Sequence, residues 1–281
     1  MNESETWTCP TCHATVSTPF CPECGERSPR ERDLTLGGIF NQLVQALTQV
    51  DGKLILSFRR LVTRPGSLTL AYIQGQRKPY VGPVSLFLIA NALFFAIESW
   101  TGGTIFTTPL DSHLHTQPWS DVARRWVPRR LESMQTTLGA YAPIFDRAMA
   151  RNARSLIVLM ALCFIAAPAI AFYRSKRPLG AHAVFSLHVY SFLLLLLSVA
   201  TLIPPVDLWF GGAGFRSESL DDTISIALML VCGLYVHVAI GAVYGATGAS
   251  RVFKAAALTV AVAAIVLGYR FVLFVLTLYT T

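Results

Sequence analysis

Four cysteines near the N-terminus have the spacing of a metal site. Cys9 and Cys12 form one CxxC turn, and Cys21 and Cys24 form a second after eight intervening residues. Each turn directs two thiolates at one point, so the two turns together predict a tetrahedral zinc site. A segment this short cannot bury a core, and zinc would therefore supply its folding energy. Four thiolates leave no open coordination position, so we expect the zinc to be structural.

Other chemistries use similar cysteines. The run CPTCH, from Cys9 to His13, fits the haem c attachment pattern, but haem is not expected because that reaction follows export and the polar, acidic first residues do not resemble an export signal. Disulfides need an oxidising compartment, which conflicts with the cytoplasmic position predicted below. Rubredoxin-like iron uses the same ligands and stays an alternative to zinc.

Ionisable residues within apolar segments form a second set of candidates. Glu98 and Arg270 lie at similar expected depths on two such segments, where they would pair, or instead face water and the outer phosphates separately. His188 and His237 lie on two further segments, where facing imidazoles would bind a metal, hold haem or relay protons. The alternative is that each histidine bonds a nearby polar group between helices. Together the four residues are a candidate intramembrane polar site.

The composition indicates what class of protein carries these residues. Of 281 residues, 53% are hydrophobic and only 14% are charged, whereas soluble domains carry about a quarter charged residues. This excludes an ordinary soluble enzyme. No P-loop, dinucleotide fingerprint, nucleophile elbow or HExxH motif occurs, so no catalytic residue is assigned and no enzymatic activity is expected.

Five apolar segments have the length of membrane spans, and the predicted fold class is an all-α integral membrane protein of five transmembrane helices. We expect three regions: a zinc ribbon at 1–29, an amphipathic juxtamembrane region at 30–80, and the transmembrane domain at 81–281. An extracytoplasmic helical loop at 101–154, interrupted near Pro128, is expected within the last, and Pro168 should kink the second span. The spans are Val81–Trp100, Ser155–Tyr173, Ala183–Ile203, Ile224–Ala246 and Ala255–Leu278.

The distribution of basic residues predicts the orientation. Short connections at 174–182 and 247–254 are basic, which places them and the N-terminus in the cytoplasm and the C-terminus outside. The arginine-rich 101–154 loop disagrees, but long loops translocate with less regard to charge. The basic residues that give the net charge of +7 flank the spans and do not form one stripe. This distribution therefore predicts contact with anionic headgroups and no binding of nucleic acid.

Residues 36–61 carry an apolar stripe at helical spacing, broken near Asp51 and ended by Thr63-Arg64-Pro65-Gly66. Two positions are open for this stripe: the headgroup plane, or the protein's own bundle. Arg59 and Arg60 lie beside it, and Arg77 and Lys78 follow at the expected headgroup level. These four residues are the candidate headgroup contacts.

One stretch carries a resemblance. From Leu34 to about Phe95, the motifs TRPG and AYIQGQRKPYVGPVSLFLIAN follow the two CxxC turns. This combination resembles a family of bacterial inner-membrane proteins that is classified only as domain of unknown function 3667. The resemblance implies a bacterial inner-membrane protein with a cytoplasmic ribbon, and it implies no activity.

Two functions remain open at this point. The first is an accessory or scaffold protein whose cytoplasmic ribbon docks a protein partner, because a four-cysteine ribbon without other chemistry is usually an interaction module. The second is a transporter or lipid-handling protein with a cavity lined by the four intramembrane residues. Five spans do not divide into two equal halves, so a pore would need a homo-oligomer. An intramembrane enzyme is a third, weaker alternative.

Overall fold

The computed structural model describes residues 6–9, 14–23, 52–76, 79–103, 105–212 and 218–281. Contacts divide the chain into a small unit, Met1–Lys53, and a large unit, Leu54–Thr281. Of the predicted zinc ligands, Cys12 and Cys24 therefore lie outside the described residues, as do Arg77 and Lys78.

The small unit contains a short hairpin. Strand β1 (Trp7–Thr8) pairs antiparallel with β2 (Thr15–Val16), with Trp7 opposite Val16. The Cys9 amide donates to the Ala14 carbonyl across 2.9 Å and extends the pairing into the first cysteine turn. Cys9, Val16 and Cys21 form one buried cluster.

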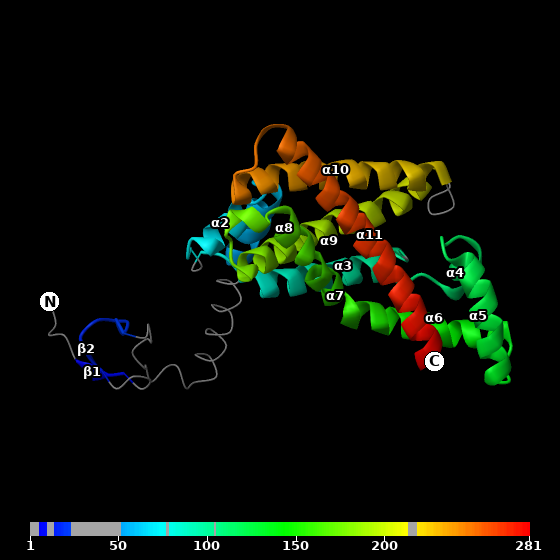
Figure 1. The fold of residues 1–281 in the computed structure, drawn as a ribbon. Helices are drawn as coiled ribbons and strands as arrows, with labels where there is room; N and C mark the ends of the chain where they lie inside the picture. Colours follow the sequence, from blue (N-terminus) through cyan, green and yellow to red (C-terminus); the bar gives the residue numbers. More distant parts are fainter. Residues whose placement is uncertain (1–5, 10–13, 24–51, 77–78, 104, 213–217) are drawn as a thin grey trace. The chain divides into compact units, whose positions relative to one another are not determined.

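The large unit is helical, and four of its helices are long and apolar enough to cross a membrane. These are α3 (Pro83–Thr101), α9 (Leu179–Trp209), α10 (Glu218–Tyr244) and α11 (Gly248–Thr280). α3 packs along α9, and α10 packs along α11 (Figure 1). Each overlaps a predicted span, which confirms a helical membrane protein.

The predicted second span is bent. α6 (Leu138–Leu156) continues into α7 (Val158–Phe164) and α8 (Ala166–Ala171) with a bend of 46° after α6, and the described residues hold four spans, or five if this pair counts as one. A further break at Ile165 lies one turn before Pro168. Proline has no N–H to bond the carbonyl four residues earlier, which is why the helix breaks there. A short 3₁₀ turn, η2 (Tyr173–Ser175), follows.

The segment before the first span packs on the bundle. Residues 52–63 are helical and α2 (Ser67–Ile73) follows. Leu61 and Leu68 are buried in the bundle core, with Leu54 and Phe58 packed against it. For these residues the stripe packs on the protein's own bundle, which is one of the two predicted positions. The earlier part of the stripe, up to Val50, lies outside the described residues.

Gly66 joins this segment to α10. The helix ends at Thr63, as the Pro65 argument predicts, and Gly66 turns the chain with a φ of +81°. A Cβ at Gly66 would lie 2.6 Å from the carbonyl oxygen of Ala239. Glycine is therefore required twice, by the left-handed backbone and by the close approach of α10.

At the other end of the bundle, α4 (Leu110–His115) and α5 (Ser120–Ser133) form a helical cap. The predicted interruption near Pro128 is wrong, because α5 runs through this residue without a break. Pro128 lies on the exposed side of the helix. Proline leaves the carbonyl four residues earlier without an N–H donor, and on this side water can bond that carbonyl instead. The remaining helical hydrogen bonds and the buried side chains of Ala123 and Val127 hold α5 together.

Candidate functional site

Three arginines gather around one pocket in front of the first span. The pocket has a volume of about 460 Å³, within the range of small-molecule sites. We call it the arginine pocket, and its lining residues are Leu56, Arg59, Arg60, Thr63, Arg64 and Tyr80.

Helical spacing places these side chains together. Leu56, Arg60 and Thr63 are separated by four and three residues, so they lie on one face of the 52–63 helix, and Arg59 flanks them. Leu54, Phe58 and Leu61 occupy the opposite face and pack in or against the core. The helix thus buries its apolar side and turns its arginines outward.

Tyr80 closes the pocket from the start of the first span. The Val81 amide donates to the buried Ser57 hydroxyl across 3.0 Å, which fixes the chain before α3 against the 52–63 helix. The Arg60 guanidinium carbon then lies 4.9 Å from the centre of the Tyr80 ring, a cation–π distance.

Arg60 is held in place by one further contact. Its Nε donates to the Ser67 hydroxyl across 3.2 Å, and that hydroxyl donates to the Arg64 carbonyl across 2.7 Å. A guanidinium carries five N–H donors, so this bond leaves both terminal nitrogens for a ligand. Arg59 and Arg64 are exposed at the rim.

This arrangement is suited to an anion. No carboxylate is among the residues that line the pocket, so nothing in the lining neutralises the three positive charges. Guanidinium groups bind phosphate and carboxylate through paired N–H bonds, and a tyrosine near a bilayer surface lies at headgroup level. The geometry can therefore hold a phosphate group.

Arg59 and Arg60, two of the predicted headgroup contacts, line this pocket together with Arg64 and Tyr80. The family comparison falls on the same stretch. Residues 51–95 match the family of proteins of unknown function called DUF3667. The match confirms the resemblance to a family of unknown function and contains every lining residue of the arginine pocket. No curated protein and no solved structure matches the chain.

Gly66 lies inside the DUF3667 segment as well, directly after Arg64 and Pro65. The motif TRPG therefore joins two features: an arginine that lines the pocket and a glycine that lets α10 approach closely. Spacing alone indicated a helix end here, whereas the contact with α10 is visible only in the fold.

The candidate intramembrane charges lie at the opposite end. Glu98 is buried, and its Oε1 accepts from the Phe106 amide across 3.1 Å. Arg270 donates from Nη2 to the Thr108 hydroxyl across 3.3 Å. The two side chains thus reach the same segment, 105–108, between α3 and α4. The ring of Phe106 lies edge-on to Phe94 and to Tyr269.

His113, a histidine of the cap, also belongs to this buried region. Its ring stacks on Phe274 at 4.7 Å between centroids, and Trp119 Nε1 donates to its Nδ1 across 3.1 Å. Burial and, to a smaller extent, the positive charge of Arg270 lower the pKa of His113 from 6.5 to about 4. His113 is therefore neutral near pH 7.

The two candidate histidines have different partners. His188 is buried in α9, and its Nδ1 bonds the Thr69 hydroxyl of α2 across 2.8 Å. His237 contributes its backbone carbonyl, which accepts from Arg251 Nε across 2.7 Å. Gly241 makes this second contact possible, because a Cβ there would lie 2.5 Å from the guanidinium carbon of Arg251. Within the described ranges, no group of three or more His, Cys, Asp or Glu side chains could hold a metal.

The cysteine ribbon is described only in part. Cys9 and Cys21, one from each CxxC turn, are both buried in the same small cluster around Val16. The four-cysteine zinc site stays a prediction, because Cys12 and Cys24 lie outside the described residues.

Proposed function

We propose that this protein is a non-enzymatic accessory membrane protein that binds the phosphate of an anionic lipid headgroup in the arginine pocket and docks a cytoplasmic protein partner through its ribbon. The observation that carries the proposal is the position of the pocket. Three arginines line it directly before the first span, within the segment that matches DUF3667.

The surroundings of the pocket support a headgroup rather than a soluble anion. The 52–63 helix is held against the bundle by its apolar face, so its arginines stay close to the end of the first span. Arginines at this level meet lipid phosphates, whose negative surface attracts basic residues by about 1 kcal/mol each. Tyr80 adds an aromatic wall of the kind enriched at bilayer interfaces.

The basic connections predict which surface this is. Arg177 donates to the Val243 carbonyl at the end of α10, and the Lys254 ammonium lies 4.4 Å from the centre of the Phe172 ring. Gly66 packs on the same end of α10. By the positive-inside rule the pocket therefore faces the cytoplasm, in a bacterial inner membrane with the C-terminus outside.

The ribbon forms the second part of the proposal. Cys9, Cys12, Cys21 and Cys24 would hold a structural zinc, whose coordination supplies the folding energy of the segment. The hairpin around these residues would then present a rigid surface to a protein partner. The shared burial of Cys9 and Cys21 supports this reading.

Transport has less support. Glu98, Arg270 and His188 each bond groups of the protein itself, and the arginine pocket is lined by none of them. Lipid handling remains compatible with the pocket, since a protein that binds a headgroup at the surface can also deliver or sense that lipid.

Lipid retention tests the headgroup site. The full chain is purified in detergent, incubated with phosphatidylglycerol or phosphatidylcholine, and examined by native mass spectrometry. Substituting Arg59, Arg60 and Arg64 by Gln should lower phosphatidylglycerol retention by about tenfold or more, because each lost charge-assisted hydrogen bond costs about 1.4 kcal/mol or more. Arg174→Gln, an exposed arginine in a connection at the same end, is the control and should retain the lipid. Equal retention by the triple variant and wild type would contradict the proposal.

Affinity purification tests the ribbon. Cys21→Ser should lose both the bound zinc, measured by elemental analysis, and the co-purifying cytoplasmic partner, while Cys163→Ser in α7 should lose neither. An unchanged set of partners in Cys21→Ser would argue against docking.

A further inference from the structure

The cap carries a second pocket whose lining resembles that of the first. It has a volume of about 190 Å³, and we call it the cap pocket. Its lining residues come from α5 and from the end of α11: Trp126, Arg129, Arg130, Ser133, Leu278 and Tyr279. We propose that the cap pocket binds the phosphate of a lipid headgroup at the membrane surface opposite the arginine pocket.

The position of the cap pocket follows from α11. This helix has 33 residues and is therefore about 50 Å long, more than the thickness of a bilayer's hydrocarbon core. It begins at Gly248, directly after the end of α10 on which Gly66 packs, and reaches Leu278 and Tyr279 at its far end. Figure 1 shows α2 and α5 at opposite ends of the long helices. The two pockets therefore lie at opposite surfaces.

Helical spacing builds one wall of the pocket. Trp126, Arg130 and Ser133 are separated by four and three residues, so they share one face of α5, with Arg129 beside them. The rings of Trp126 and Tyr279 lie side by side, with 6.4 Å between centroids and planes tilted by 57°. Paired aromatic rings of this kind mark the interface of a bilayer and set the depth of the arginines.

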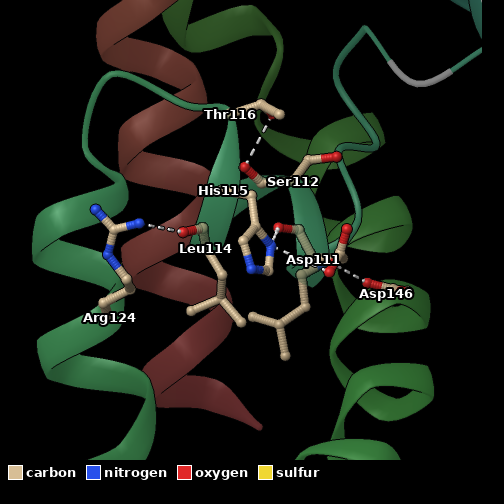
Figure 2. Close-up of polar contacts among 8 residues, drawn as sticks. Asp111, Ser112, Leu114, His115, Thr116, Arg124 and Asp146 are labelled. Carbon is tan, nitrogen blue, oxygen red and sulfur yellow. Dashed lines mark hydrogen bonds and ion pairs between the residues drawn. The ribbon is translucent and has the colours of Figure 1, made fainter. Parts of the chain in front are cut away.

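The rest of α5 is fixed by other contacts. Arg124 donates to the Leu114 carbonyl of α4 across 3.3 Å (Figure 2). It also donates to Asp121 across 2.5 Å. Asp146 of α6 accepts from the Leu110 amide at the start of α4 across 2.8 Å. Hydrogen bonds thus hold α5 to α4 and α4 to α6, and the remaining arginines of α5 lie on a helix that is fixed in position.

Arg130 supplies the observation that points to a ligand. Its side chain is half-buried, and its Nε is a buried donor without a hydrogen-bond partner in the part of the chain that the structure describes. A buried donor left unmatched is costly, and an anion in the pocket would satisfy it. No carboxylate is among the lining residues, and the Ser133 hydroxyl already donates to the Arg130 carbonyl across 2.7 Å. The ligand must therefore bring the negative charge.

The chemistry favours a lipid phosphate over a peptide carboxylate. The pocket combines two guanidinium groups with two aromatic rings and Leu278, which matches a phosphate head above the first carbons of an acyl chain. This inference uses residues that the arginine pocket does not share, so it stands whether or not the proposed function is correct.

Stoichiometry tests the second site on the full chain in detergent. Native mass spectrometry with phosphatidylglycerol should show two retained lipids on the wild type. Arg129→Gln/Arg130→Gln should lose one of them, with about a tenfold or greater drop in occupancy. Arg125→Gln is the matched control, since this exposed arginine on the same helix does not line the pocket. The triple Gln variant of the arginine pocket should still hold the cap-pocket lipid.

Two outcomes would overturn the inference. One is an unchanged second lipid in Arg129→Gln/Arg130→Gln. The other is that inorganic phosphate at millimolar concentration displaces the lipid completely, which would mark a site for a soluble anion. If the double variant does not purify in a folded form, Arg130→Lys serves instead. It keeps the charge but loses the Nε donor, so a severalfold drop in occupancy is expected, and wild-type occupancy would count against the site.

Discussion

The arginine pocket and the region around Glu98 and Arg270, at opposite ends of the bundle, use their charged residues in different ways. In the arginine pocket, Arg59 and Arg64 are exposed at the rim and Arg60 is only half-buried. At the cap end, Glu98 is buried and bonds the Phe106 amide, while Arg270 donates to Thr108. The arginine pocket therefore leaves donors for a ligand, whereas Glu98 and Arg270 bond the 105–108 segment of the protein itself.

This difference changes how a charge within an apolar segment should be interpreted. Burying a charge is costly, and here the protein itself supplies one hydrogen bond to Glu98 through the Phe106 amide and one to Arg270 through the Thr108 hydroxyl. A buried charge is then mainly structural. The arginines at a membrane surface cost little to keep and retain unused donors, so here the ligand sites are expected at the surfaces.

The largest expected effect concerns Gly66, which lies behind the arginine pocket. Gly66→Ala should lower the free energy of unfolding by roughly 3–4 kcal/mol, since it combines a left-handed backbone with a Cβ that would clash with the Ala239 carbonyl. Denaturant titration in detergent micelles measures this. Gly75→Ala is the control, because Gly75 has a φ of +88° but open space around it, and it should cost only about 1 kcal/mol. Equal losses in the two variants would show that close packing on α10 is unimportant.

The pH dependence of stability tests the cap end. His113 has a pKa of about 4 in the fold and 6.5 when unfolded. Between pH 6.5 and about pH 4, His113 is protonated in the unfolded chain but stays neutral in the folded chain. The free energy of unfolding should therefore fall by up to about 3 kcal/mol as the pH drops through this window. Thermal unfolding at several pH values should show this loss in wild type.

Substitutions at two histidines of the cap, His113 and His115, test this prediction. His113→Phe keeps the stacked ring on Phe274 and should abolish the pH dependence, whereas His115→Gln should preserve it, because the His115 side chain is 62% exposed. A pH profile unchanged in His113→Phe would mean that other groups carry it.

Glu98 offers the next largest effect. Glu98→Ala should lower the free energy of unfolding by about 2 kcal/mol, since the buried Phe106 amide loses its acceptor. Glu98→Gln keeps an oxygen at that position and should lose less than half of this. If Gln were as damaging as Ala, the negative charge rather than the hydrogen bond would matter, and the contrast between the two ends would need revision.

The smallest expected effect is on the arginine pocket itself. Arg59→Gln/Arg64→Gln should change the free energy of unfolding by less than about 1 kcal/mol when measured in detergent without anionic lipid, because both side chains are exposed. A loss above about 2 kcal/mol would place these arginines among the structural charges, as at the cap end. The comparison of the two ends would then fail.

Several features were predictable from the sequence because they depend on local rules. Hydropathy located the four long spans, since about 20 apolar residues are needed to cross a bilayer whatever their neighbours. Pro65 and Pro168 marked helix breaks because proline removes a hydrogen bond in any context. Pro128 did not break α5, and Pro143 in α6 and Pro204 and Pro205 in α9 also lie inside continuous helices.

Partner choices were not predictable in the same way. Glu98 and Arg270 lie at similar depths, and each bonds the 105–108 segment, Glu98 the Phe106 amide and Arg270 the Thr108 hydroxyl. His188 bonds Thr69 rather than a group of α10, because α2 packs there. Depth follows from counting residues, whereas partners depend on how each helix is rotated and on which segment fills the space between.

The sequence by itself therefore determined the class of the protein, the approximate limits of its spans, the cysteine spacing and the DUF3667 resemblance, all of which rest on short-range patterns. Only the tertiary structure decided that three arginines share one pocket and that two more face the end of α11. The physical reason is that a pocket forms where separate elements meet, and the packing of their apolar faces sets that meeting.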